Sequence, residues 1–227
     1  VDLGLREVRG VGEEVDEGQM EQIITNSTDT GQTISIPNAP TISETEWKVL
    51  TDALSAENWD RAVVYSASLL NRLKVDNDAK QVARLRYFYL YALAGRILKA
   101  HDAAKTTEEE AAWRELDKSV ETLIGKEFVM PPREYRTTCE KNLNLICPAK
   151  DSDKILRTTA TKKDGNAILS FDYVAFEKKI ELKDHPDKQL FLGGTLKKVE
   201  FNDELSKAQP WVMYLIFEKG FIRVVDN

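Results

Sequence analysis

The spacing of apolar residues changes near residue 150, from intervals of three and four residues to short runs rich in β-branched and aromatic residues. The first spacing is typical of amphipathic helices, and the second is typical of strands. The chain is therefore predicted to be an α+β protein, with a helical bundle followed by a small antiparallel β-barrel or bent sheet. We divide it into an extended or disordered arm over 1–40, a helical domain over 41–149 and an all-β domain over 150–227.

Five helices are predicted in the first part. A capping pair, in which a side-chain acceptor is followed three residues later by Glu or Gln, starts three of them; the pairs are Ser43 and Glu46, Asp78 and Gln81, and Thr107 and Glu110. The third helix is apolar on most sides, which predicts that it is the central one. Pro132 suits the first turn of the fifth helix, and Pro148 ends it. The expected ranges are 43–54, 58–73, 78–97, 107–123 and 132–148.

About five strands are predicted after residue 150, over 155–161, 168–182, 190–201, 211–217 and 221–225. The sequence Lys163-Asp164-Gly165-Asn166 predicts a tight hairpin. Glu218-Lys219-Gly220 predicts a second hairpin. Gly193-Gly194 interrupts the third strand and indicates a bend or bulge.

The two cysteines, Cys139 and Cys147, fall within the predicted fifth helix. Eight residues along a helix separate them by about 12 Å. A disulfide needs Cα atoms within about 7 Å of each other. We therefore expect no disulfide between them.

The negative charge of the chain lies in its first 40 residues. This arm holds two basic and eight acidic residues, and its net charge is therefore −6. The whole chain has the same net charge of −6, so both folded parts are nearly neutral. Binding of duplex nucleic acid normally needs a broad basic surface. We therefore do not favour nucleic acid as a partner.

No apolar run reaches the roughly 18 residues that a membrane-spanning helix needs. The sequence begins at Val1 without a methionine. We expect a soluble protein, either cytoplasmic or exported after removal of an N-terminal segment.

Residues 58–95 resemble a tetratricopeptide repeat. Asn58-Trp59-Asp60-Arg61-Ala62 is similar to the opening of such a repeat, and 89–95, which ends at Gly95, is similar to its second helix. The resemblance implies a helical hairpin whose groove binds an extended or helical peptide.

The β part is similar in length and strand number to an oligonucleotide- and oligosaccharide-binding (OB) barrel. Leu192-Gly193-Gly194-Thr195-Leu196 resembles the glycine-containing strand that such barrels use at a bend. This resemblance implies binding of single strands or glycans on the barrel surface.

Catalytic motifs for phosphate binding, serine hydrolysis or zinc binding are absent from the sequence. Its two histidines are His101, at a predicted helix end, and His185 in Asp184-His185-Pro186-Asp187, where turn chemistry explains the residues. A hydrolase using Asp184, His185 or Asp187 is the third hypothesis. We predict no enzyme, no cofactor and no metal site.

The leading hypothesis is a non-catalytic interaction or scaffold protein that binds a protein or peptide partner. Arg84, Tyr87 and Tyr91 lie off the main apolar stripe of the third helix and are the predicted contacts.

The alternative is single-stranded nucleic acid or glycan binding by the β part. Tyr173 and Trp211 are its candidate stacking residues, and Lys197 and Lys198 its candidate charges. The sequence does not decide the ligand or the oligomeric state.

Overall fold

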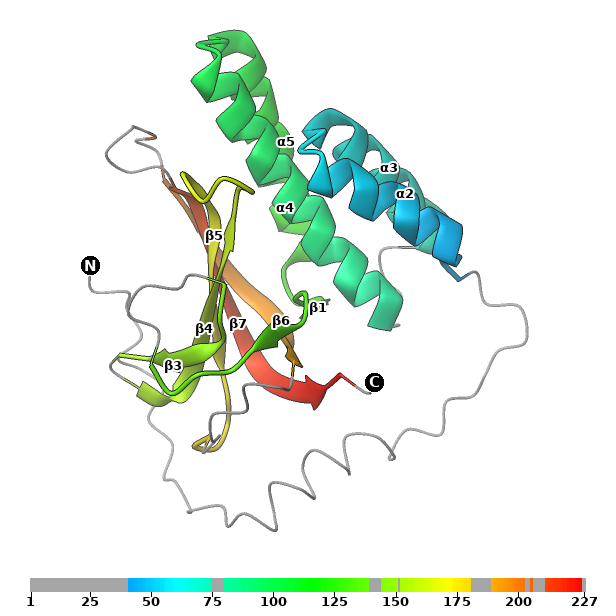
Figure 1. Cartoon of the computed structure of the whole chain (residues 1–227). Coiled ribbons are helices and arrows are strands. Elements are labelled where there is room, and N and C mark those ends of the chain that lie inside the picture. Colours follow the sequence, from blue (N-terminus) through cyan, green and yellow to red (C-terminus); the bar gives the residue numbers. More distant parts are fainter. Residues whose placement is uncertain are drawn as a thin grey trace.

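In the part of the chain that the structure describes, four helices are followed by a sheet of seven strands, and the helices lie on one side of the sheet (Figure 1). The computed structural model describes residues 41–74, 80–138, 144–150, 152–180, 189–202, 205 and 211–225. The predicted arm over 1–40 lies outside this part. The helices are α2 (Glu44–Ser55), α3 (Trp59–Leu73), α4 (Lys80–Asp102) and α5 (Thr106–Leu123).

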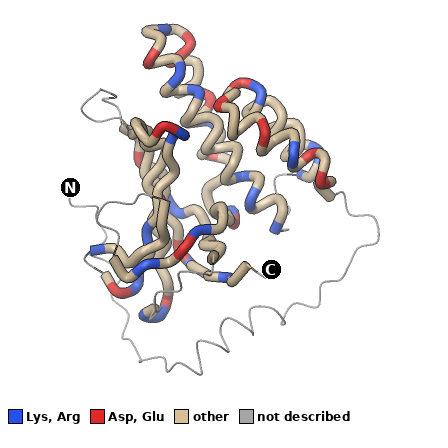
Figure 2. The backbone as a smooth tube through the Cα atoms, viewed as in Figure 1, with Lys and Arg blue, Asp and Glu red and all other residues tan. Residues whose placement is uncertain are grey.

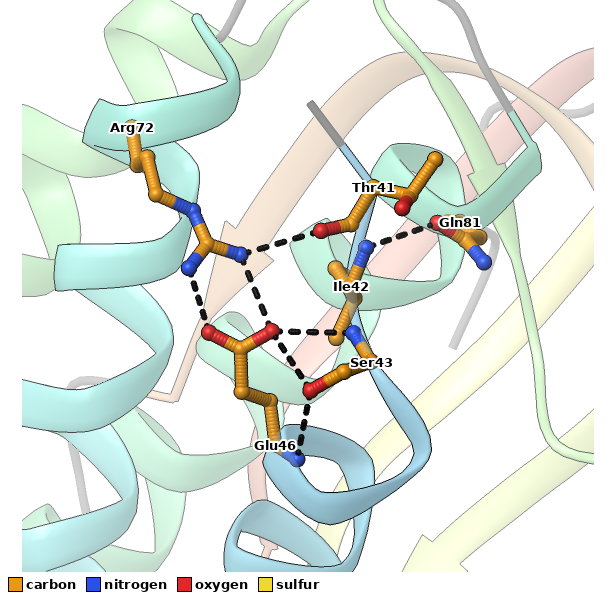
Figure 3. A network of polar contacts seen from close by, with 6 residues as sticks. All are labelled: Thr41, Ile42, Ser43, Glu46, Arg72 and Gln81. Atoms are coloured by element: carbon orange, nitrogen blue, oxygen red, sulfur yellow. Dashed lines mark hydrogen bonds and ion pairs between the residues drawn. The ribbon is translucent and has the colours of Figure 1, made fainter. Parts of the chain in front are cut away.

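Helix α2 begins at the predicted capping box. The Ser43 side chain accepts a hydrogen bond from the backbone N–H of Glu46, and the Glu46 side chain accepts one from the backbone N–H of Ser43 at 2.9 Å. Arg72 of α3 forms an ion pair with Glu46 and donates to the carbonyl of Thr41 at 3.2 Å (Figure 3). The side chain of Gln81 in α4 accepts a hydrogen bond from the backbone N–H of Ile42 at 3.1 Å. We call this set the α2 clamp, because it ties the start of α2 to both α3 and α4.

Helix α4 is the central helix, as its apolar surface predicts. It packs against α3 and α5 and also against the sheet through β1, β5 and β7. The ring of Trp59 in α3 packs so closely against Gly95 that a Cβ there would lie 2.3 Å from the ring. The second residue of the repeat-like segment is therefore in direct contact with its last residue.

Helix α5 begins one residue before the predicted start. Its N-cap is Lys105, whose side chain makes no capping hydrogen bond, so the predicted capping box at Thr107 is wrong. Lys105 instead forms an ion pair with Glu108 at 3.0 Å. Gly125, just past the helix, has φ of 79°, a left-handed conformation that glycine adopts without strain.

The sheet is open and mixed, and the predicted closed antiparallel barrel is not supported. Its order is β1-β6-β7-β5-β4-β3, and β2 pairs with β6. Pairing is antiparallel except between β5 and β7, which are neighbours in the sheet and run parallel. The strands are β1 (Glu127–Val129), β2 (Arg133–Glu134), β3 (Cys147–Ala149), β4 (Ser152–Thr161), β5 (Ile168–Ala175), β6 (Gln189–Phe201) and β7 (Trp211–Val224).

The first predicted hairpin is confirmed and the second is wrong. Strands β4 and β5 pair across the turn that contains Gly165. In contrast, β7 continues through 218–220, and both of its ends pair with β6. A left-handed Lys219 (φ 52°) produces an irregularity within one strand and not a reversal of the chain. The bulge expected at Gly193-Gly194 is confirmed by a register shift between Gly193 and Thr195.

The fifth helix predicted over 132–148 is wrong. The described part of this range forms β2, an isolated bridge between Tyr135 and Ile146, and β3. The backbone of Arg136 donates to Ile146, so the chain returns beside itself and does not wind into a helix. The helical separation used to exclude a disulfide does not apply, and Cys147 is disulfide-bonded. The other cysteine of the chain, Cys139, lies outside the described residues.

The change from helices to strands lies at Gly125, earlier than the change in apolar spacing near residue 150. Both parts contribute to one hydrophobic core, which includes Leu90 and Leu93 of α4 and Leu169 and Leu215 of the sheet. The helices therefore cover one face of the sheet and share its core.

Candidate functional site

A buried polar network joins α4 to the inner face of the sheet. The hydroxyl of Tyr87 donates to Asp172 at 2.6 Å, and the hydroxyl of Ser170 donates to the other carboxylate oxygen, also at 2.6 Å. Asp172 is fully buried and Tyr87 is 2 % exposed. Burial raises the pKa of Asp172, although its two hydrogen bonds and the charge of Arg133 oppose the shift. Burial also raises the pKa of Tyr87 well above its usual value.

Arg133 lies beside this network. Its guanidinium donates to the hydroxyl of Thr158 and to the backbone carbonyl of Thr159, both on β4. Among the described residues no carboxylate lies within ion-pair distance of it. Its charge acts through space on Asp172 and Tyr87.

The junction between helices and sheet contains an open cleft of about 460 Å³. We call it the junction cleft. Helices α2 and α4 form one wall, and the end of β4 with its hairpin forms the other. Its lining residues are Thr51, Leu54, Ser55, Glu57, Tyr87, Phe88, Tyr91, Pro131, Arg133, Asn144, Thr161, Lys162, Lys163 and Gly165.

The junction cleft carries three cations and one carboxylate, Glu57. Lys162 pairs with Asp102 at the end of α4 at 3.3 Å. The side chain of Lys163 is exposed and has no ion pair with an acid in the described part of the chain. Positive and negative residues are otherwise interspersed over both parts of the molecule (Figure 2). As far as the structure describes the chain, Arg133 and Lys163 are thus two cations of one cleft that have no paired carboxylate.

Glu57 connects the two walls of the cleft. Its side chain accepts the backbone N–H of Lys163 at 2.7 Å. Its own backbone has φ of 51°, which is unfavourable for a residue with a side chain. The turn between α2 and α3 therefore holds Glu57 against the hairpin.

The three residues predicted to contact a partner lie along one side of α4, and two of them line the cleft. Tyr91 is partly buried and donates to the carbonyl of Thr161 at 3.0 Å, and burial raises its pKa to about 12. Tyr87 lies at the buried base of the cleft. Arg84 lies outside it, with its guanidinium 5.3 Å from the ring centre of Trp47 and 5.9 Å from that of Phe191.

Two of the four alternative ligand residues meet at Tyr214, on the sheet. The ring of Tyr214 lies 6.0 Å from Tyr173 and 4.5 Å from Trp211, and it stacks on Phe171 at 5.1 Å. We call these four rings the Tyr214 cluster. All four are partly buried.

The two lysines predicted beside this cluster are already paired with acids. Lys198 pairs with Glu200 at 2.6 Å, and Glu200 lies opposite Tyr214 in the sheet. Lys197 pairs with Glu218 at 3.5 Å. Both of these lysines therefore already have a glutamate as partner.

A second hollow of about 500 Å³ lies where α3, α4 and α5 meet, with alanines among its lining residues. Its cations are paired: Arg96 with Glu115, Lys99 with Asp60 and Lys105 with Glu108. It therefore offers a ligand no cation without a partner.

The residues of the hydrolase hypothesis, Asp184, His185 and Asp187, lie outside the described residues. His101 lies at the end of α4, with its Nδ1 3.2 Å from a carboxylate oxygen of Glu109. Within the described ranges, no three His, Cys, Asp or Glu side chains are placed to hold a metal ion.

Sequence reasoning missed Arg133, Lys163, Glu57 and Asp172. Arg133 was assigned to a helix, and Lys163 was read as part of a turn. Asp172 lies 85 residues from its partner Tyr87, and Glu57 lies 106 residues from Lys163. No local pattern identifies contacts over such distances, although the lone acid between apolar residues of a predicted strand is a signal for Asp172.

No family model, curated protein or solved structure matches the chain. In the described segments, none of the helices has the length and apolar character required to span a membrane.

Proposed function

We propose that the protein is a non-catalytic interaction protein that holds an acidic segment of a partner protein in the junction cleft. The observation that carries this proposal is the presence of Arg133 and Lys163 in a cleft with aromatic and aliphatic walls, where neither cation is paired with a carboxylate of the described residues. A carboxylate bound there would gain charge-assisted hydrogen bonds. The rings of Phe88 and Tyr91 would contact the apolar part of the segment.

We also infer that α3 and α4 act as a tetratricopeptide-like pair, with a modified groove. The contact between Trp59 and Gly95 supports this assignment. The sheet packs over Tyr87 and covers part of the face of α4 that would bind a peptide in an isolated repeat. Only the part of this face that lines the junction cleft is left for a peptide to contact.

The test is fluorescence anisotropy of the full chain with labelled peptides of equal length that are acidic, neutral or basic. We expect only the acidic peptide to bind, with an affinity that falls as salt is added. Lys163→Glu should weaken binding about tenfold or more, equivalent to about 1.4 kcal/mol.

Lys118 is the matched control, because it is an exposed lysine of α5 that is not among the described lining residues of the cleft. Lys118→Glu makes the same change in net charge and should alter the affinity by no more than about twofold. Equal losses in the two variants would show a general charge effect and would reject the cleft as the site.

The Tyr214 cluster supports a second candidate function, glycan binding on the sheet. Stacking of sugars on aromatic rings needs no net charge, and the neighbouring lysines are paired with glutamates. Nucleic acid would instead favour unpaired cations. Titration with neutral oligosaccharides, followed by tryptophan fluorescence, should show a response that Trp211→Ala abolishes. Binding of single-stranded DNA that weakens with salt would favour the nucleic-acid version.

A further inference from the structure

Two arginines that lie next to Phe191 have no acidic partner. Arg84 is in the second turn of α4, and Arg223 is near the end of β7. Within the described residues, neither guanidinium makes an ion pair or a hydrogen bond. Both side chains are partly exposed. The described part of the fold therefore leaves the charge of both arginines unbalanced.

Phe191 of β6 brings the two arginines to one place. The guanidinium carbon of Arg84 lies 5.9 Å from the centre of the Phe191 ring. Arg223 is directly opposite Phe191 in the pairing of β6 with β7. Directly opposed residues of an antiparallel pair place their side chains on the same face, with Cβ atoms about 5 Å apart. Both arginines are therefore neighbours of one ring.

Aromatic rings hold both guanidinium groups without using their hydrogen-bond donors. The guanidinium carbon of Arg84 lies 5.3 Å from the ring centre of Trp47 and 5.4 Å from that of Phe88. The guanidinium carbon of Arg223 lies 4.7 Å from the ring centre of Phe221. The N–H donors of arginine form a planar fork that stacking on a ring leaves free. In each of these side chains only Nε is buried without a hydrogen-bond partner, so the terminal nitrogens are the donors that a ligand can reach.

The small number of cations favours a ligand with one phosphate group. A phosphate monoester carries a charge of about −1.5 to −2 at neutral pH and has three acceptor oxygens. Two guanidinium groups can each donate two parallel hydrogen bonds to such a group, whereas a carboxylate carries only one charge. Nucleic acids and anionic membranes need a broader positive surface. Elsewhere on this molecule the positive and negative residues are interspersed (Figure 2).

We propose that Arg84 and Arg223 form a second binding site, which takes the phosphate of a phosphorylated side chain in a partner protein. We call this site the arginine pair. The lining of the junction cleft includes neither arginine, so the arginine pair does not depend on the acidic segment proposed for the cleft. Trp47 and Phe191 are partly exposed beside the arginine pair and would contact the residues that flank the phosphate.

The first experiment measures fluorescence anisotropy of the full chain with a labelled Gly-Ala-Ser-Ala-Gly peptide in three forms. The serine is phosphorylated, unmodified or replaced by glutamate. At about pH 7.5 the phosphopeptide should bind at least about tenfold more tightly than the other two. Its affinity should fall by up to about tenfold at about pH 5, because the second pKa of the phosphate is about 6. Equal affinities for the three forms would overturn the proposal.

Protein variants locate the phosphate. Arg84→Gln and Arg223→Gln should each weaken phosphopeptide binding by about tenfold or more. Arg61→Gln is the matched control, because Arg61 is an exposed arginine of α3 without an ion pair in the described residues. This variant makes the same change in net charge and should alter the affinity by no more than about twofold. Equal losses in the three variants would show a general charge effect and would overturn the site.

Lysine variants keep the measurement decisive if a glutamine variant does not fold. Arg84→Lys and Arg223→Lys keep the charge but lose the planar fork, and each should weaken phosphopeptide binding by about fivefold. Wild-type affinity in both lysine variants would show that the paired forks do not hold the phosphate and would overturn the proposal.

Two further measurements exclude other sites and other sources of phosphate. Lys163→Glu should leave phosphopeptide binding within about twofold of the wild type. A larger loss in this variant, with none in Arg84→Gln, would place the phosphate in the junction cleft and overturn the arginine pair while leaving the proposed function intact. Vesicles of phosphatidylcholine and phosphatidic acid present a phosphate monoester on a lipid. Cosedimentation with these vesicles, without binding of the phosphopeptide, would overturn the assignment to a protein ligand.

Discussion

Two polar networks join elements in this protein, and they differ in burial and in the sequence distance between their members. The α2 clamp lies mostly at the surface, and its bonds span 3 residues between Ser43 and Glu46, 26 between Glu46 and Arg72, and 39 between Ile42 and Gln81. The network of Tyr87, Asp172 and Ser170 is buried, and its central bond spans 85 residues. An exposed ion pair contributes little to stability, whereas a buried polar group is expensive to leave without its partner. The second network should therefore contribute more to holding the helices on the sheet than the first contributes to holding the start of α2 against α3 and α4.

The largest effect is expected for Tyr87→Phe, which removes the donor from a fully buried carboxyl. We expect the free energy of unfolding to fall by about 2–3 kcal/mol, measured by chemical denaturation. Tyr89→Phe is the matched control, since Tyr89 lies two residues away on α4 and its hydroxyl lies 3.0 Å from that of Ser119 in a partly buried site. For Tyr89→Phe, the free energy of unfolding should fall by about 1 kcal/mol. Equal losses of stability in Tyr87→Phe and Tyr89→Phe would contradict the larger contribution expected from the hydrogen bond to Asp172.

The buried network should also give stability a pH dependence. Because burial raises the folded pKa of Asp172 above its unfolded value of about 3.9, the folded protein keeps this proton after the unfolded chain has released it. The stability from this group is fully present below about pH 4 and is lost as the pH rises through the folded pKa.

Asp172→Asn cannot titrate and should remove this part of the pH dependence. The free energy of unfolding of the wild type, relative to the variant, should fall as the pH rises above about 4 and then become constant. Asp117→Asn, an exposed change on α5, is the control and should follow the wild type. If the free energy of unfolding of the wild type, relative to the variant, rose with pH instead, the effect of the hydrogen bonds on the pKa of Asp172 would outweigh that of burial.

A smaller effect is expected at the α2 clamp. Ser43→Ala removes the side chain that accepts the N–H of Glu46, and loss of such a cap lowers stability by about 1 kcal/mol. Ser43→Asp restores an acceptor and should recover most of the loss. Denaturation curves in which Ser43→Ala lost more than Tyr87→Phe would reverse the ranking of the two networks.

The smallest effect should come from acid titration of the clamp. The hydrogen bond from Arg72, followed by that from the backbone of Ser43, lowers the pKa of Glu46 from 4.5 to about 2. The stabilisation is therefore present above about pH 4.5 and is lost as the pH falls toward 2. Glu46→Gln should remove this loss of stability at low pH. It should leave unchanged the pH dependence of stability above about pH 4.5, which comes from Asp172. If Glu46→Gln lost as much stability at low pH as the wild type does, the pairing of Glu46 with Arg72 would be contradicted.

The same contrast explains which predictions were confirmed. The starts of α2 and α3 were predicted because Ser43 and Asn58 cap the helices that follow them directly. The segment after Pro132 was wrongly predicted as a helix, because a proline suits both a helix start and an irregular chain. Glu218-Lys219-Gly220 was wrongly predicted as a hairpin, because the same residues fit a bulge and only pairing with β6 decides between them.

The sequence by itself determined the α+β composition and the hairpin between β4 and β5, because each depends on residues near one another along the chain. It also determined the central position of α4, because that helix is apolar on most sides and needs neighbours around it. It also placed Arg84, Tyr87 and Tyr91 off the main apolar stripe of α4. Only the tertiary structure decided that β5 and β7 are parallel, that Asp172 receives the hydroxyl of Tyr87, and that Arg133 and Lys163 share a cleft. These features depend on which distant segments pack together, and the burial gained in that packing is a property of the whole core.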